Sequence, residues 1–253
     1  MNRPRLLVVA AVLYGAGASP ALSADIPLGI QNAARCAPRA ASTTGPTDPL
    51  RIIGAQDSVP RALFGTRDLL IIGAGTGRGV ALGQQFVIRR GPATGGWHVA
   101  GPRAIGTSGW LRIVAVNETT SIGTVEFACD GILRGDYLEP YFEPILPANL
   151  DRTDTTGELD FSTPARVLFG DEERTTGATG DFMVIDAGLS HGAEPGARFA
   201  IYRDLNVSGV PLAPVGEAIV VLASADTAVV RLTMTRDAVQ RGDLLIPRRK
   251  PSQ

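Results

Sequence analysis

Several residue types are scarce in this chain of 253 residues, and each scarcity removes a class of structure or function. Two cysteines and two histidines are too few for a four-ligand zinc site unless all four converge. Lysine occurs once, at Lys250, and the net charge is −1, so no broad positive field would draw the chain to nucleic acid. Beyond the amino end, no apolar run approaches the length of about 18 residues that a membrane-spanning helix needs.

The amino end has the features of a signal peptide. Arg3 and Arg5 precede an apolar stretch at 6–17, which is too short to span a bilayer as a helix. Small residues follow at 16–18 and 21–24, and a cut near Ser23 or Ala24 is favoured. We expect residues 1–24 to be removed on export to the periplasm or outer envelope; the alternative is an uncleaved amino-terminal anchor. The near absence of lysine is typical of a GC-rich genome and favours an exported bacterial protein.

The two cysteines, Cys36 and Cys129, both lie outside the signal peptide. In an oxidising compartment an even pair is more often bridged than free. A bridge would pin the amino-terminal segment to the first folded unit, and loop entropy alone would contribute about 4 kcal/mol. The alternative is two buried free thiols.

The strongest signal is an internal duplication, in which residues 68–90 and 181–203 align without a gap. The blocks 109–114 and 216–221 continue the match after a loop of unequal length. Identical residues occupy the following equivalent positions, the last two of them near the end of each copy: Asp68/Asp181, Ala74/Ala187, Gly75/Gly188, Gly79/Gly192, Gly83/Gly196, Phe86/Phe199, Ile88/Ile201, Arg90/Arg203, Gly135/Gly242 and Asp136/Asp243. Two copies are too few for a solenoid, so each must have its own core.

Each copy is typical of β structure. Short apolar runs at 69–72 and 182–185 have strand length, and 86–89 and 199–202 alternate as strands with one buried face do. Further strands are expected at 113–116, 124–128, 219–222 and 228–232. Five or six short strands in about 80 residues predict a small barrel without exposed edges. The predicted fold is therefore all-β, a tandem duplication of a five- to six-stranded barrel-like domain.

This fold predicts the domain organisation. The expected parts are the signal peptide at 1–24, an irregular segment at 25–60, the first repeat at 61–148, a linker at 149–165, the second repeat at 166–248 and a tail at 249–253. Leu63-Phe64-Gly65, which resembles Leu168-Phe169-Gly170, is taken to open the first repeat. Apart from 51–53, the irregular segment is expected to be extended or partly disordered. The only helix expected is a short one near Ile132.

Several motifs are open to both a chemical and a structural interpretation. The GAGTGRG sequence at 73–79 resembles a phosphate loop but lacks the Lys-Ser/Thr ending, which favours a turn. Arg-Gly-Asp occurs at 134–136 and 241–243, at the same position of both copies, which favours a turn over a cell-adhesion site. Asp68 and Asp181 are expected to cap turns or strand starts. No catalytic, cofactor-binding or metal-ligating residue is predicted.

The spaced glycines of the second copy, with Phe199, Ile201 and the closing Gly242-Asp243, carry a family resemblance. The pattern resembles a β-domain of exported bacterial envelope proteins, and in particular the carboxy-terminal domain of flagellar assembly protein T. It is also similar to the β-domain that follows LysM modules and, more distantly, to the barrels of rod-shape-determining protein C. The resemblance implies a β-barrel fold and a role without catalytic residues or cofactors.

The expected function is that of a non-enzymatic scaffold or protein-interaction module of the cell envelope, with envelope proteins as partners. The first alternative is a peptidoglycan- or glycan-binding module, and the second is a hydrolase with acidic residues of both repeats converging between them. The loop at 91–109, flanked by Trp97 and Trp110, is the surface expected to contact a partner. Trp110 would otherwise belong to the core.

Overall fold

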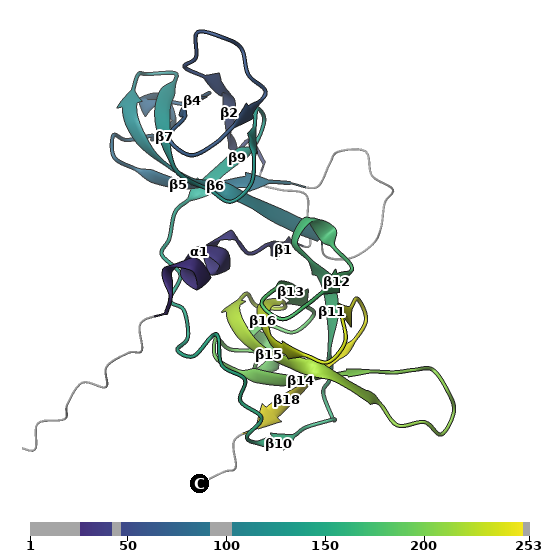
Figure 1. Ribbon diagram of the computed structural model, residues 1–253. Coiled ribbons are helices and arrows are strands. Elements are labelled where there is room, and N and C mark those ends of the chain that lie inside the picture. The colour runs from purple at the N-terminus through teal and green to yellow at the C-terminus, as the bar shows by residue number, and fades with distance from the viewer. Residues whose placement is uncertain (1–25, 42–46, 92–102, 250–253) are drawn as a thin grey trace, which may run out of the picture.

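The computed structural model describes residues 26–41, 47–91 and 103–249. It is almost entirely β, with 46% of residues in strands and 8% in helices, and it contains two closed six-stranded barrels (Figure 1). The all-β fold and its duplication are therefore confirmed. All strand pairs are antiparallel, and closure leaves the six strands of each barrel without an open edge.

The two barrels are built from equivalent strands in the same spatial order. Barrel 1 has the order β6-β5-β9-β2-β4-β7 and closes through the β6–β7 pair. Its strands are β2 (Leu50–Ala55), β4 (Leu69–Ile72), β5 (Gln85–Arg90), β6 (Arg103–Val116), β7 (Ser121–Ala128) and β9 (Tyr137–Pro140). Barrel 2 has the order β15-β14-β18-β11-β13-β16 and closes through the β15–β16 pair. Its strands are β11 (Ala165–Gly170), β13 (Phe182–Ile185), β14 (Arg198–Arg203), β15 (Ala213–Ala223), β16 (Ala228–Thr235) and β18 (Leu244–Arg249).

Alternation along each strand fills the barrels with aliphatic side chains. In barrel 1 the inward residues include Ile52, Leu70, Ile72, Ile88, Leu111 and Ile113. In barrel 2 they include Val167, Met183, Ile185, Ile201, Val220 and Leu245. All twelve of these are at most 1% exposed, so each repeat has the separate core that the sequence predicted.

The start of the first repeat differs from the sequence prediction. Leu63–Phe64 forms β3, which pairs with β8 (Ile132–Leu133), and its counterpart in barrel 2 is β12 (Thr176–Gly177), paired with β17 (Val239–Gln240). Leu168-Phe169-Gly170 instead lies in β11, whose counterpart is β2. The match of Leu-Phe-Gly was therefore coincidental, and the first repeat begins at β2, inside the segment 25–60, and not at residue 61. Ile132 lies in a strand and not in the short helix expected there.

The segment 25–60 is more ordered than expected. It contains α1 (Leu28–Cys36), β1 (Arg39–Ala41) and β2. The helix has only nine residues, and its apolar side consists of Ile30 and Ala34 with Ile26 and Ala37 just outside its ends. This apolar stripe is short and rests partly on alanine. A helix is recognised in a sequence by about three turns of apolar periodicity, and the stripe is shorter than that.

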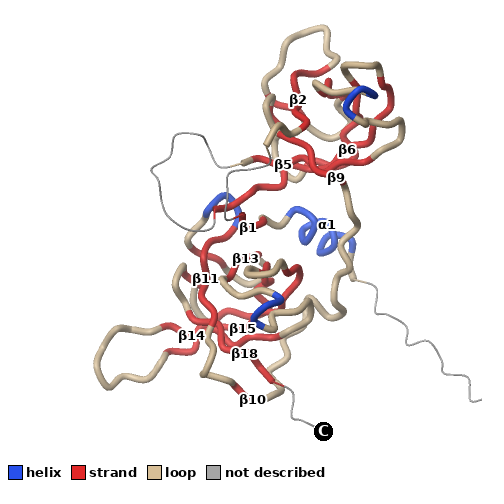
Figure 2. Tube along the Cα trace, turned by 180° about the vertical axis from the view of Figure 1, so that it is seen from behind, coloured by secondary structure: helices blue, strands red, loops and turns tan. Residues whose placement is uncertain are grey.

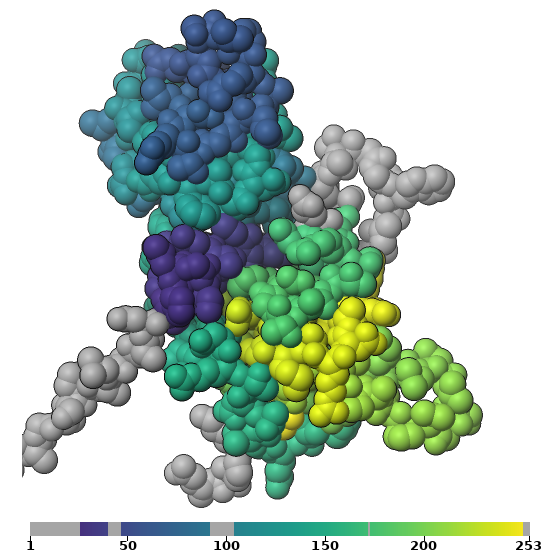
Figure 3. Space-filling model, viewed as in Figure 1, coloured from purple at the N-terminus to yellow at the C-terminus, as the bar shows by residue number. Residues whose placement is uncertain are grey.

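Helix α1 lies between the two barrels and packs on the outside of barrel 2 (Figures 1 and 3). There Ala34 and Leu150 join a buried cluster with outward-facing residues of barrel 2. Those residues are Phe169, Phe182, Val184, Ile219, Val221 and Val229. After α1, β1 pairs with the start of β6, which extends beyond barrel 1 (Figure 2). The amino-terminal segment thus contacts both barrels.

The Cys36–Cys129 disulfide is present and ties the end of α1 to the segment that follows β7 of barrel 1. The predicted bridge is therefore confirmed. Because α1 packs on barrel 2, the bridge also links barrel 1 to a helix held by the other barrel.

The linker at 149–165 is bound to barrel 2 along much of its length. Leu150 is 1% exposed, β10 (Glu158–Leu159) pairs with β18, and Ala165 is already the first residue of β11. Because the segment is mostly polar, the sequence did not predict that Leu150 is buried or that β10 forms.

Candidate functional site

Part of the surface loop expected to carry partner contacts is a strand. Residues 92–102, with Trp97, lie outside the described residues, and 103–109 belong to β6. Trp110 is 7% exposed and stacks on Phe127, with 4.7 Å between the ring centroids. The alternative that Trp110 is buried is therefore correct, and its ring forms part of the wall of a cavity.

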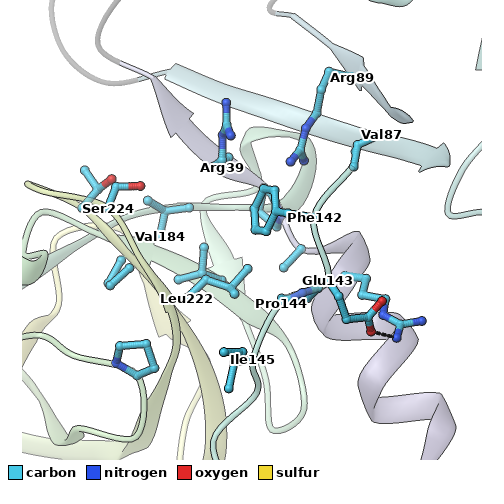
Figure 4. A pocket seen from close by; sticks show the side chains of 18 of the residues that line it. Arg39, Val87, Arg89, Phe142, Glu143, Pro144, Ile145, Val184, Leu222 and Ser224 are labelled. Atoms are coloured by element: carbon cyan, nitrogen blue, oxygen red, sulfur yellow. Dashed lines mark hydrogen bonds and ion pairs between the residues drawn. The ribbon is translucent and has the colours of Figure 1, made fainter. Parts of the chain in front are cut away.

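This cavity has a volume of about 410 Å³ and lies where barrel 1, α1 and barrel 2 meet (Figure 4). The end of α1, β1, the outer face of β5 and β6, and the segment 141–145 form one side. Residues of β13, β15 and β16 of barrel 2 form the other. Its apolar lining includes Val87, Phe142, Pro144, Ile145, Val184 and Leu222. We call it the inter-barrel groove, and its volume lies in the range of roughly 300–1,000 Å³ usual for binding sites.

The segment 141–145 leaves apolar side chains in the open part of the groove. Phe142 is 57% exposed and Ile145 is 91% exposed, although both lie beside the buried outer face of barrel 2. Large apolar side chains in a concave site, with few polar groups around them, are typical of surfaces that bind a partner.

A cluster of charged side chains lies on the barrel 1 side of the groove. Glu139 accepts hydrogen bonds from Arg39 at 2.9 Å and from Arg89 at 3.2 Å. Arg89 also donates to Thr107, whose hydroxyl in turn donates to the carbonyl of Ala37 at 3.1 Å. Two arginines thus share one carboxylate, which leaves the cluster with one net positive charge.

Arg89 is held in this cluster despite burial of its side chain, which is only 7% exposed. Burial and the nearby charge of Arg39 lower its pKa, while Glu139 opposes that shift. A guanidinium nevertheless stays protonated in proteins. Figure 4 shows the Arg89 side chain extending from β5 towards Phe142, so the cluster presents a permanent cation to the groove.

Arg35, in the last turn of α1, supplies a second cation. Its Nη2 donates to Glu143, and its guanidinium lies 5.7 Å from the centre of the Trp110 ring. Its Nε is buried and has no hydrogen-bond partner among the described residues. A buried donor without an acceptor is unfavourable, so a ligand oxygen at this position would be stabilised.

Tyr141 and Tyr137 add two phenolic groups to this side of barrel 1. The Tyr141 hydroxyl donates to Glu143 at 2.7 Å, and burial together with this hydrogen bond raises the pKa of Tyr141 to about 12. The Tyr137 hydroxyl is buried without a partner among the described residues, and burial raises the pKa of Tyr137. Tyr137 pairs across the strands with Arg89, so this second unsatisfied group lies next to the charged cluster.

The groove therefore combines apolar walls with fixed hydrogen-bond donors. An apolar group that also carries a carboxylate or carbonyl oxygen would match it, since the walls would bury the apolar part and the arginines would pair with the oxygen. Among the described lining residues the one carboxylate is Glu143, which is paired with Arg35 and Tyr141. The converging pair of carboxylates on which the hydrolase alternative depends is not found in this lining.

The two aspartates singled out by the duplication cap turns, as predicted. Asp68 accepts a hydrogen bond from the backbone of Gly65 at 2.8 Å, and Asp181 accepts one from Ala178 at 2.9 Å. Asp68 also pairs with Arg61, and these hydrogen bonds lower its pKa against the opposing effect of burial.

The aspartates of the two Arg-Gly-Asp sequences are buried, which supports the turn interpretation. Asp136 is 5% exposed and accepts two hydrogen bonds from Arg90, at 3.0 and 2.8 Å. Asp243 is 4% exposed and accepts two from Arg203, both at 2.8 Å. Carboxylates enclosed in this way cannot serve as adhesion ligands.

The glycine-rich segment 73–79 is also a turn, and its glycines have steric roles. A Cβ on Gly75 would lie 2.0 Å from the carbonyl oxygen of Asn117, and one on the equivalent Gly188 would lie 2.3 Å from that of Ser224. Gly79 has a φ of 78°, which L-residues rarely adopt. The same steric constraints act in both barrels, which explains why glycines occur at equivalent positions of the two copies.

The sequence analysis singled out Trp110 beside a loop, but the groove that it lines was not predicted, because the residues that form the groove are not shared between the copies. Arg89 corresponds to Tyr202, and Trp110 corresponds to Glu217, both at outward-facing positions. The only available signal was this divergence itself, since outward positions that differ between two copies mark surfaces with separate roles.

No helix among the described residues is long and apolar enough to cross a membrane. The same residues contain no group of three or more His, Cys, Asp or Glu side chains suited to a metal ion. Comparison of the chain with family models and with curated proteins finds no match.

Proposed function

We propose that this is an exported cell-envelope protein that binds an extended segment of a partner protein in the inter-barrel groove. The observation that carries the proposal is the presence in one groove of exposed Phe142 and Ile145 together with two cations, the buried Arg89 and the half-buried Arg35. The segment would carry apolar side chains for the walls and a carboxylate for the arginines.

Two features support the placement in the envelope. A disulfide persists in an oxidising compartment, and the amino end has the features of a signal peptide. The duplicated barrel, with its spaced glycines and buried Arg–Asp pairs, is compatible with membership of the envelope β-domains that the sequence resembles. We therefore also propose that this chain belongs to that family of envelope β-domains.

A protein segment is favoured over a glycan because the aromatic rings are already engaged. Sugars bind by stacking on an open aromatic face, whereas Trp110 is 7% exposed, with Phe127 stacked on it and Arg35 beside it. Of the three aromatic residues in the described lining, Trp110, Tyr141 and Phe142, only Phe142 is exposed. Apolar and proline side chains dominate the remaining lining.

The test is a peptide-display selection on the exported, oxidised protein, followed by affinity measurement of the selected peptides. We expect peptides with two or three apolar residues near an acidic one. Phe142→Ala should weaken their binding at least tenfold, and Arg39→Ala should weaken it about fivefold and reduce its salt dependence. Leu205→Ala is the control, because Leu205 is 50% exposed but lies outside the groove lining.

Selected peptides that bind the Phe142→Ala variant as well as the parent protein would overturn the proposal. Incubation with purified cell wall decides the glycan alternative. If the protein is retained on the cell wall at moderate salt and Phe142→Ala abolishes this retention, peptidoglycan is favoured as the ligand. If the protein is not retained, the proposal of a protein partner stands.

A further inference from the structure

A second surface, on the side of barrel 1 away from α1, exposes aliphatic side chains. It spans the outer faces of β2, β4, β7 and β6, which are neighbours in the barrel. Figures 1 and 2 show β2 on the far side of barrel 1 from α1. The aliphatic residues on this surface are Ile53 (42% exposed), Leu69 (38%), Val114 (44%) and the half-buried Ile71 and Ile122. We call this set the outer patch of barrel 1.

The strand equivalences show that barrel 2 has the same patch in a covered state. Leu69, Ile71 and Ile122 correspond to Phe182, Val184 and Val229, and Val114 corresponds to Val221. These four residues of barrel 2 are at most 9% exposed. Ile53 corresponds to Leu168, which packs against the same buried cluster.

An apolar helix face forms part of the cover over the patch of barrel 2, beside Ala104 of β6 and Leu146 of the segment after β9. Ile30 and Ala34 of α1, with Ile26 before it and Ala37 after it, pack on the cluster, together with Leu150. Small or aliphatic side chains at a spacing of about four residues place one helix stripe on a sheet. One barrel of this chain thus shows which kind of element fits this surface.

From this counterpart we infer that the outer patch of barrel 1 binds an amphipathic helix of a partner protein, with aliphatic and small residues at the spacing of Ile26, Ile30 and Ala34. The helix cannot be this chain's own α1, whose apolar side is already buried on barrel 2 and whose end is fixed by the disulfide.

A second copy of the chain is a less suitable occupant because of the size of the patch. A stable dimer buries about 800 Å² on each partner. Five side chains, three of them no more than 44% exposed and two half-buried, offer much less than that. A short helix needs a smaller area, as α1 shows on barrel 2. This surface is separate from the inter-barrel groove, and the inference does not depend on the proposed function.

The probe is a synthetic helical peptide with isoleucine, isoleucine and alanine at the spacing found in and before α1. It is titrated into methyl-labelled protein and followed by nuclear magnetic resonance. We expect saturable shifts at Ile71, Ile122 and Val114, and Ile122→Asp should weaken binding at least tenfold. Leu205→Asp, an equally polar change at an exposed site in the loop after β14, should leave the affinity unchanged.

Three results would overturn the inference. The first is the absence of saturable shifts at millimolar peptide, and the second is equal binding by the Ile122→Asp variant. The third is a dimer in sedimentation that Ile122→Asp converts to a monomer, which would assign the patch to a second copy. Unchanged hydrogen exchange in the barrel 1 core of Ile122→Asp establishes that the variant is folded.

Discussion

Barrel 1 and barrel 2 hold the same ion pair in the same place, Arg90 with Asp136 in one and Arg203 with Asp243 in the other. Their outer faces agree less well: apolar residues recur at Leu69/Phe182 and Ile71/Val184, but other positions differ. On the strand that carries the arginine, Arg89 of barrel 1 stands where barrel 2 has Tyr202. The inward-facing residues preserve the barrel, whereas outward positions differ where barrel 1 carries the charged wall of the groove and barrel 2 carries α1.

The covering helix α1 is the clearest difference between the two copies. It packs on barrel 2, yet a disulfide holds its end to barrel 1, and no equivalent helix covers barrel 1 among the described residues. A duplicated fold can therefore serve two roles when a single extra element is placed on only one copy. Five predictions separate the shared interior from the diverged exterior.

The largest effect is expected from breaking the link between the barrels. Replacing both cysteines, Cys36→Ser with Cys129→Ser, should lower the free energy of unfolding by about 4 kcal/mol, because the closed loop is long. Denaturant unfolding measures this, with the reduced parent protein as the control. A loss below about 1 kcal/mol would show that the bridge adds little to the packing of α1.

Matched substitutions of the buried aspartates test the shared interior. Asp136→Ala and Asp243→Ala should each cost about 3 kcal/mol, because each removes a buried carboxylate that accepts two hydrogen bonds from an arginine and one from a backbone N–H. Hydrogen exchange should show lost protection in barrel 1 for the first variant and in barrel 2 for the second. Costs that differ by more than about 2 kcal/mol would contradict the equivalence of the two pairs.

The diverged exterior predicts unequal costs at equivalent positions. Phe182→Ala should cost about 3 kcal/mol because it opens the cluster beneath α1. Leu69→Ala, at the matching position of barrel 1, should cost about 1 kcal/mol because Leu69 is already 38% exposed. Equal costs would mean that the outer patch of barrel 1 is covered in solution.

The glycine turns should again behave alike in both copies. Gly75→Ala and Gly188→Ala should each cost about 2 kcal/mol, because the new methyl group would overlap a backbone carbonyl. Gly79→Ala has open space around the new methyl group and should cost about 1 kcal/mol from its positive φ alone. Thermal unfolding of the three variants ranks them, and a reversed order would refute the steric explanation.

The smallest effect concerns pH. Tyr141 has its pKa raised to about 12, so its neutral form is favoured in the folded state over the unfolded one, where the pKa is about 10. This contribution is complete below about pH 10 and is lost as the pH rises towards 12. Titration of tyrosinate absorbance should show a late component that Tyr141→Phe reduces by one tyrosine, because burial also raises the pKa of Tyr137. A late component of unchanged amplitude in this variant would contradict the assignment to Tyr141.

Prediction from the sequence succeeded where the two copies agree. A duplicated barrel was indicated by the glycines, by Asp68 with Asp181, and by the apolar alternation. The same backbone geometry constrains these positions in both copies, so their residues recur. The sequence set 51–53 apart from its surroundings, but the place of β2 as the first strand of the repeat was missed, because only Arg51 and Arg166 are identical between β2 and β11.

The groove could not be predicted, because it is assembled from segments that are distant in the chain. Arg35 and Glu143 meet across 108 positions, and Arg39 meets Glu139 across 100. Neither pair has a counterpart in the other copy, and no local pattern marks either one. Only the relative placement of α1 and the two barrels brings them together.

The most direct test of the account is a methyl-resolved nuclear magnetic resonance titration of the oxidised protein with a peptide selected by display. The account predicts that the largest shifts occur at Val87, Ile145 and Leu222 in the inter-barrel groove, while the interior methyl groups of Ile88 and Ile201 stay in place. Largest shifts at Val207 and Val210, in the exposed loop between β14 and β15, would contradict it.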